Sequence, residues 1–227
     1  MILCIDTSTT VCSAALCRDG RAEAHLELFE CNAHASSLTP LIERLFAGQG
    51  IDPLRDIDAV AVSCGPGSYT GLRIGVSTAK GLCYSLSRPL IAISTLKVLA
   101  AAVAEVCADA QTIVPMIDAR RMEVYTAIYD SQLRELSPAR ALVVEPDSFA
   151  ELAVAPGLCF AGSGAGKCSS VLDLPNARFL PDVHPLAASM AGLACAAFEA
   201  RDFVDTAYFE PFYLKDFVAT KPKNKVF

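Results

Sequence analysis

The hydrophobic residues of the chain fall into short alternating runs, and two of these runs begin in the same way. Residues 5–16 and residues 117–128 each start with an apolar strand that ends in Ile-Asp, make a short turn and return through a second, alternating strand. The two aspartates, Asp6 and Asp118, are 112 positions apart, about half of the 227-residue chain. This pattern predicts a β-hairpin at the start of each half.

The segments after each hairpin alternate between helical and strand-like patterns, which is typical of an α/β fold. In the first half we predict helices over 34–46, 68–85 and 95–107 and strands over 57–63 and 90–93. In the second half we predict strands over 141–144 and 158–161 and helices over 147–153 and 186–200. The matching order predicts two duplicated lobes of mixed sheet flanked by helices, whereas the three identities at one offset, taken alone, also arise by chance.

The end of the chain is expected to return to the first lobe. Residues 205–217 carry five aromatic side chains after the last long predicted helix, so we expect them to pack on the first half. We therefore place the first lobe at residues 1–108 plus 203–227 and the second at 109–202. The segment Lys221–Lys225 predicts a solvated tail, with contact to an RNA backbone as the alternative.

Composition limits the class of protein. Hydrophobic residues make up 53% of the chain and charged residues 19%, which excludes a disordered chain and favours sheets covered on both faces. The apolar helical stretches are too short to span a bilayer and the first residues lack a signal-peptide pattern, so we expect a cytoplasmic protein without membrane contact. A net charge of −6 argues against binding nucleic acid by electrostatics alone.

The ten cysteines occur singly within apolar segments, which predicts small core residues in a reducing compartment rather than disulfides. Cys31 and His34 form a Cys-x-x-His pair, but no second pair stands at metal-ligand spacing. We therefore predict no metal site.

The most specific motif is a glycine-rich loop over residues 65–75, which follows a predicted strand and enters a predicted helix. Backbone N–H groups in this context can receive an anion. The loop is neither a Walker loop nor a dinucleotide fingerprint, because Thr70 occupies the third glycine position of the latter. Phosphate binding and close helix packing both remain open for its structural glycines, Gly65, Gly67, Gly71 and Gly75.

Candidates for nucleotide binding are weaker elsewhere. Gly162 and Gly164 open a second glycine run, which imitates a P-loop but lacks its first glycine and its terminal Ser/Thr. Asp6 and Asp118 end equivalent strands, where paired carboxylates can hold Mg²⁺ and phosphates across a cleft. The turns that follow them contain no glycine for close approach of a phosphate, and no Ser/His/Asp catalytic set can be assembled.

Two helices of the first half are candidates for a partner surface. The helix over 34–46 has one apolar stripe, which is ordinary core packing. The helix over 71–85 has apolar residues on two sides, and Ile74, Thr78 and Leu82 lie on the second side. Such a helix is either sandwiched in the fold or presents one side to a partner.

Four of these segments together resemble the TsaB (YeaZ) family. They are the start over residues 5–8, the glycine-rich loop, the segment Asp118–Tyr125 and the ending over 213–215. The resemblance covers nearly the whole chain. It implies the actin-like ATPase fold, which is ribonuclease H-like and duplicated, and a role in attaching threonylcarbamoyl to the adenosine beside the anticodon of tRNAs that read codons starting with A.

The resemblance also implies a non-catalytic scaffold. The transferase of that system is a paralogue, TsaD, whose metal is held by a His-x-x-x-His motif, whereas here Leu38 stands four positions after His34. The expected partners are TsaD, the ATPase TsaE, tRNA through the complex, and a second copy of the chain. No intrinsic cofactor is expected, with ATP or ADP at a subunit interface as an alternative. The expected interface with TsaD comprises His34, Leu38, Leu41, Leu45, Tyr69, Arg73, Ile74, Thr78 and Leu82.

Two enzymatic readings compete with the scaffold. One is an independent ATP-dependent kinase or transferase that uses Asp6 and Asp118. The other is a peptidase, for which the sequence offers no nucleophile motif around its three histidines.

Overall fold

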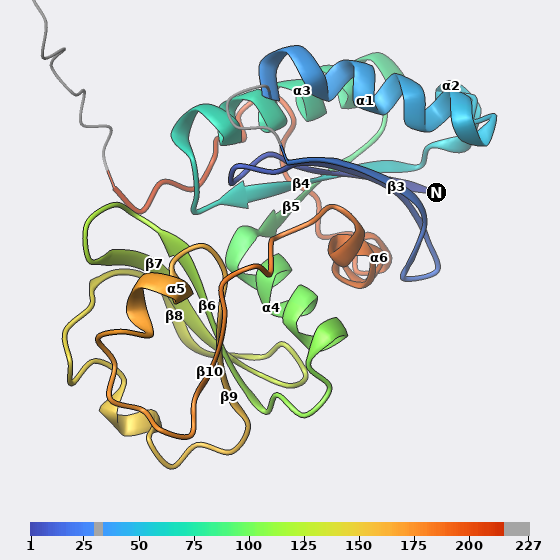
Figure 1. The fold of residues 1–227 in the computed structure, drawn as a ribbon. Coiled ribbons are helices and arrows are strands. Elements are labelled where there is room, and N and C mark those ends of the chain that lie inside the picture. Colours follow the sequence, from blue (N-terminus) through green and yellow to red (C-terminus); the bar gives the residue numbers. More distant parts are fainter. Residues whose placement is uncertain (30–33, 216–227) are drawn as a thin grey trace, which may run out of the picture.

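The computed structural model describes residues 1–29 and 34–215, and its strands form two five-stranded sheets (Figure 1). The first sheet has the order β3-β2-β1-β4-β5 and consists of β1 (Ile2–Asp6), β2 (Cys12–Arg18), β3 (Arg21–Leu28), β4 (Ala59–Gly65) and β5 (Leu90–Ser94). The second has the order β10-β9-β6-β7-β8 and consists of β6 (Thr112–Asp118), β7 (Glu123–Asp130), β8 (Glu135–Val143), β9 (Leu158–Ala161) and β10 (Arg178–Leu180). In the reverse direction, β8-β7-β6-β9-β10, the strand order of the second sheet is equivalent to that of the first.

The direction of the strands is duplicated as well. β1, β2 and β3 form an antiparallel meander, and β4 and β5 join it in parallel. β6, β7 and β8 form the equivalent meander, and β9 and β10 join it in parallel. Asp6 and Asp118 therefore end the equivalent central strands, β1 and β6. The predicted duplicated α/β fold is confirmed.

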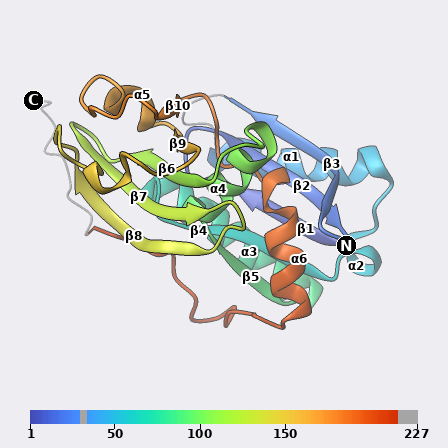
Figure 2. The same cartoon turned by 90° about the horizontal axis from the view of Figure 1, so that it is seen from below.

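Helices cover both faces of the first sheet. α1 (His34–Gln49) and α3 (Tyr69–Leu86) lie side by side on one face, and the short α2 (Pro53–Asp56) follows α1 (Figure 1). α6 (Ala191–Glu199) packs on the opposite face, next to α4 (Thr95–Val106) (Figure 2). Helices thus cover both faces of the first sheet, which agrees with the high apolar content.

α4 joins the two lobes, because opposite sides of this helix enter different cores. Val98 packs with the first sheet and α6, whereas Leu96, Leu99 and Val103 pack with Ile113 and other residues of the second sheet. All four α4 side chains are fully buried. A helix that is apolar on two sides is expected to be sandwiched in this way.

Several elements differ from their predicted bounds. The strand predicted over 141–144 is the end of the longer β8, and the helix predicted over 147–153 is replaced by turns and a 3₁₀ helix, Ala150–Leu152. Phe149 has a φ of +64°, which an α-helix does not accept. The helix predicted over 186–200 begins only at α6, after a 3₁₀ turn, and the N–H of Ala187 before that turn donates to the Ser13 hydroxyl at 2.9 Å. The elements α2, α5 (Ala165–Cys168), β3 and β10 were not predicted.

Residues 203–215, here called the C-terminal strap, run back along the first lobe. Val204 forms an isolated bridge with Leu90, and Phe209 packs on the core beneath α1 and α3. Lys80 Nζ of α3 donates to the carbonyls of Ala207 and Phe209, both at 3.0 Å. The expected return to the first half is thus observed for residues 205–213, whereas Lys215 pairs with Glu123 at the start of β7. The predicted lysine tail lies outside the described residues.

Most described cysteines are core residues. Cys4, Cys12, Cys17, Cys83, Cys107, Cys159 and Cys168 are buried, and Cys64 and Cys195 are half-buried. Cys31 lies outside the described residues. Within residues 1–29 and 34–215, no helix is both long and apolar enough to cross a bilayer.

Candidate functional site

The glycine-rich loop joins β4 to α3 and packs against the turn that follows β1. Ser68 caps α3, since its hydroxyl accepts from the N–H of Gly71 at 3.2 Å. The N–H of Ser68 donates to the Ser8 carbonyl at 2.7 Å, and the Thr7 hydroxyl donates to the Gly71 carbonyl at 2.7 Å. The loop therefore bonds to the β1 turn directly.

This packing requires glycine at four positions. A Cβ at Gly67 would lie 2.3 Å from the Ser8 carbonyl oxygen, and one at Gly71 would lie 2.0 Å from that of Thr7. A Cβ at Gly75 would lie 2.3 Å from Thr7 Oγ1, and one at Gly65 would lie 2.3 Å from the carbonyl oxygen of Phe212. The protein's own backbone fills the space beside these glycines, so the geometry favours close packing over phosphate binding.

Asp6 is completely buried at the end of β1. Its Oδ1 accepts from the backbone N–H of Ser8 at 3.0 Å and from the Ser8 hydroxyl at 2.9 Å. Its Oδ2 and the hydroxyl of Ser63 on β4 have no partner at hydrogen-bond geometry. Burial raises the pKa of Asp6 to about 6, and the rise is limited by the nearby Ser63 hydroxyl, although it lies outside hydrogen-bond geometry, and by the two bonds from Ser8.

Asp118, the equivalent residue of the second lobe, lies in a different environment. Its carboxylate is half exposed and accepts from Lys167 Nζ at 2.7 Å and from the N–H of Arg120 at 2.6 Å. Its own N–H donates to the Ser163 hydroxyl at 3.1 Å. One carboxylate is thus buried and the other is neutralised by a lysine, so the two do not form the matched pair expected of a Mg²⁺-phosphate site. Among the described residues, no group of three or more acidic, histidine or cysteine side chains is placed to hold a metal.

The second glycine run also packs against the protein's own backbone. The N–H of Gly162 donates to the Leu180 carbonyl at 3.0 Å, and that of Gly164 donates to the Met116 carbonyl at 2.9 Å. A Cβ at Gly162, where φ is +105°, would lie 2.5 Å from both Leu99 and the Met116 carbonyl oxygen. These N–H groups are therefore not directed at a ligand.

The turn between β6 and β7 has an unusual backbone that sequence reasoning missed. Arg120 and Arg121 have φ values of +72° and +49°, a conformation that costs an ordinary L-residue roughly 1–2 kcal/mol. Lys167 Nζ holds the turn by donating to the carbonyls of Arg121 and Glu123, each at 2.7 Å. Consecutive arginines between two strands were the available signal, since such turns normally contain Asn and Gly.

Four of the residues predicted to contact a partner lie in the core instead. Leu38, Leu41 and Leu45 are 1%, 2% and 3% exposed and form the inner stripe of α1. His34 is also buried, and its Nε2 bonds to the Thr9 carbonyl at 2.7 Å. The prediction that these four side chains contact a partner is wrong, because the apolar stripe of α1 faces the sheet.

The outer face of α3 is solvent-exposed. A stripe at spacings of three and four residues faces away from the core; it consists of Thr70, Arg73, Ser77, Gly81 and Tyr84. Tyr84 is 87% exposed. The predicted contacts Ile74, Thr78 and Leu82 are half-buried, and Ile74 and Leu82 pack against the core between the first sheet and the helices α1 and α3. We call the exposed stripe the α3 outer face.

Arg73 is held in place at the start of this face. Its guanidinium lies 4.1 Å from the centre of the Tyr69 ring and bonds to the Tyr69 hydroxyl. Its Nε donates to the hydroxyl of Tyr213 in the strap at 3.4 Å, and the two tyrosine rings pack with centroids 4.7 Å apart. The stacking restricts the side-chain rotamers of Arg73 before any partner binds.

Two sheets of identical strand order and direction, joined by a shared helix, define an actin-like α/β protein. A family model described as TsaD, tRNA N6-adenosine threonylcarbamoyltransferase, matches residues 30–223. The tRNA threonylcarbamoyladenosine biosynthesis protein TsaB of Escherichia coli (strain K12) is 33% identical over 226 residues, which cover 97% of this chain and 96% of that protein. The chain belongs to the TsaB family.

Further relatives agree. TsaB of Bacillus subtilis (strain 168) is 38% identical over 128 residues, which cover 56% of this chain and 54% of that protein. The solved structure of YeaZ from Pseudomonas aeruginosa superposes with a TM-score of 0.81 at 30% identity and covers 94% of this chain and 99% of that chain. The family resemblance seen in the sequence is confirmed.

Proposed function

We propose that this chain is a non-catalytic subunit in the synthesis of threonylcarbamoyladenosine in tRNA, and that it binds and activates a TsaD-type transferase through the α3 outer face. The single observation that carries the proposal is the closed β1 turn. Thr7 and Ser8 are packed against Gly67 and Gly71 at distances that leave no room even for a methyl group. A phosphate cannot enter there without displacing the loop. Family membership supplies the pathway.

Two further features support the absence of intrinsic catalysis. Asp118 is paired with Lys167 rather than left open for a metal. The histidines are engaged elsewhere, since His34 bonds to Thr9, His25 lies 3.7 Å from Glu27 and the His184 ring packs on Phe29. None of these contacts pairs a histidine with a nucleophile, so they do not support a peptidase.

The shape of the α3 outer face suits a helical partner. Small residues, Ser77 and Gly81, occupy its middle, so that another helix can approach closely. Arg73 and Tyr84 flank them, and these are residue types that dominate the binding energy of protein interfaces. In Figure 1, α3 and α1 form the outer layer of the first lobe on the side away from the second lobe. The proposed contact therefore lies on the side of the first lobe opposite to the second lobe (Figure 1).

Gly81→Glu tests the docking surface without attacking the fold. A Cβ at Gly81 meets no atom within 4 Å, and glutamate has a higher helix propensity than glycine. We expect the variant to melt at or above the wild-type temperature and to lose co-purification with TsaD. Val154→Glu, at a position that is 92% exposed in the second lobe, is the matched control and should retain TsaD.

Retention of TsaD by Gly81→Glu at wild-type level would show that the α3 outer face is not the contact. Binding of a second copy of the chain is checked in the same preparations by light scattering.

An independent ATP-dependent kinase or transferase is the second candidate, and the unpartnered Oδ2 of Asp6 is the observation that favours it. Calorimetry of the isolated chain with Mg-ATP separates the two candidates. The scaffold proposal expects no binding at micromolar nucleotide, whereas micromolar binding that Asp6→Asn abolishes would favour the enzyme.

A further inference from the structure

The turn between β6 and β7 places arginine where the backbone favours other residues. Arg120 and Arg121 are consecutive and both have positive φ, a backbone conformation that Asn and Gly adopt more readily than arginine. The rest of the fold maintains the turn, because Lys167 Nζ binds Asp118 and the carbonyls of Arg121 and Glu123. Strained residues that the surrounding structure supports are a reason to look for a function in the side chains.

The charges around the turn leave the two guanidinium groups unneutralised. Asp118 is paired with Lys167, and Glu123 is paired with Lys215 of the strap. Within residues 1–29 and 34–215, no carboxylate oxygen lies within 4 Å of the guanidinium nitrogens of Arg120 or Arg121, and both residues are exposed. The nearest acidic groups thus already have cationic partners, and they repel an incoming anion less than free carboxylates would.

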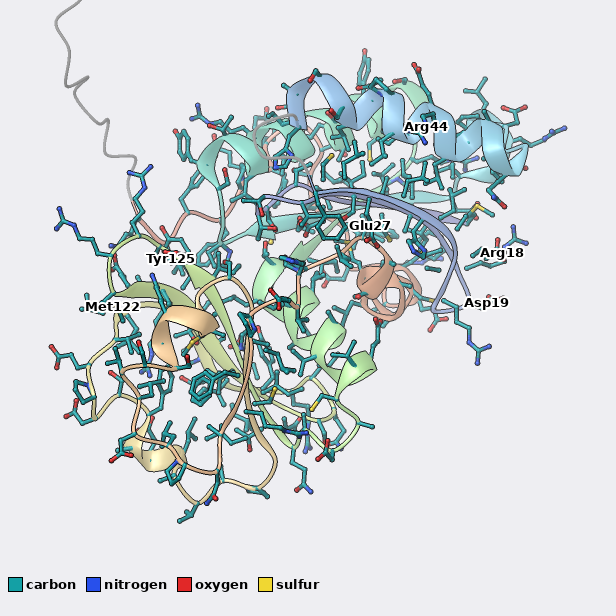
Figure 3. The ribbon with its side chains drawn as sticks, in the orientation of Figure 1. Arg18, Asp19, Glu27, Arg44, Met122 and Tyr125 are labelled. Carbon is teal, nitrogen blue, oxygen red and sulfur yellow. The ribbon has the colours of Figure 1, made fainter. Side chains whose placement is uncertain are left out.

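The C-terminal strap connects this turn to Arg73 of the first lobe. Tyr213 bonds to Arg73, and Lys215 bonds to Glu123, which begins β7. Residues 213 and 215 are at most about 7 Å apart along the chain, so the two groups share one edge of the molecule. Figure 3 labels Met122 and Tyr125, which are next to this turn in the chain.

We propose that this edge binds the phosphate backbone of an RNA, with Arg120 and Arg121 as the principal phosphate contacts. Guanidinium groups match phosphate oxygens in a two-pronged geometry. Because the whole chain has a net charge of −6, we expect contact with RNA only where basic residues gather locally, as they do at this edge. The inference rests on the proposed function for the identity of the RNA, a tRNA substrate.

The variant Arg120→Asn/Arg121→Gly separates binding from folding, because the new residues suit the turn and carry no charge. We expect it to melt at or above the wild-type temperature. Binding of the full chain, mixed with TsaD, to fluorescein-labelled tRNA at about 0.1 M salt should weaken about tenfold or more, and the salt slope should fall by roughly two. Arg120→Lys/Arg121→Lys should stay within about threefold of wild type. Arg44→Ala, on α1 and distant from the turn in Figure 3, should bind as wild type.

Equal tRNA affinity of the wild type and the Asn/Gly variant would overturn the inference, as would a wild-type complex whose tRNA affinity equals that of TsaD alone. Loss of TsaD co-purification by the Asn/Gly variant would also overturn it, because the arginines would then contact protein. Each of these results leaves the Gly81→Glu test of the docking surface unchanged, so failure of this inference and failure of the proposed function are distinguishable.

Discussion

Replacing Asp6 by asparagine is expected to stabilise the fold at neutral pH. Burial raises the pKa of Asp6 from 3.8 to about 6, a difference of about 2 units. Each unit corresponds to about 1.4 kcal/mol, so ionised Asp6 lowers the free energy of unfolding at pH 7 by about 3 kcal/mol relative to its protonated form. Asparagine keeps the acceptor for Ser8, and its new N–H₂ group can donate to the Ser63 hydroxyl, which has no partner in the wild type.

The sign of the pH dependence follows from the raised pKa. The folded state holds the Asp6 proton more tightly than the unfolded state, so this contribution to stability is complete below about pH 4 and is lost as the pH rises through about 6. Thermal unfolding of the wild type and Asp6→Asn from pH 4.5 to 7.5 isolates it. The variant's advantage should grow with pH to roughly 6–12 °C in melting temperature. A difference that stays constant with pH would refute the reasoning.

Two other predictions concern the glycines of α3 and the β6–β7 turn. Gly71→Ala should lower the free energy of unfolding by about 3 kcal/mol or more, because its Cβ would lie 2.0 Å from the Thr7 carbonyl oxygen. Gly81→Ala, with no atom near its Cβ, should raise the free energy of unfolding by about 0.5–1 kcal/mol. Urea unfolding of both variants measures the contrast, and similar effects of the two would show that Gly71 is not required for close packing. Lys167→Met should lower the free energy of unfolding by about 2 kcal/mol, since it removes the ion pair with Asp118 and two hydrogen bonds to backbone carbonyls. Amide hydrogen exchange should rise first in the β6–β7 turn. Unchanged protection there would contradict the role of Lys167 in holding this turn.

The duplicated fold could be predicted because its signal is local and occurs twice. Each half begins with an apolar strand that ends in Asp, and the hairpin pattern identifies the central strand of each sheet. The third strand was missed although residues 21–28 alternate in polarity, since the prediction stopped at the preceding turn. The helix predicted over 147–153 failed because the sequence does not show the left-handed backbone of Phe149.

The candidate site was predicted less well, for a physical reason. An apolar stripe on a helix indicates burial without saying what covers it, and on α1 the sheet covers Leu38, Leu41 and Leu45. On α3 the exposed stripe is polar or small, so hydrophobicity does not reveal it. The Arg120–Arg121 turn depends on backbone angles and on Lys167, which lies 46 positions further along the chain.

Threonylcarbamoyl transfer to tRNA by a TsaD-type transferase, measured with and without this chain, tests the central claim most directly. The scaffold account predicts that the wild-type chain and Asp118→Asn both support transfer, that Gly81→Glu does not, and that the chain alone transfers nothing. Transfer by the chain alone, or full support of the transferase by Gly81→Glu, would contradict the account.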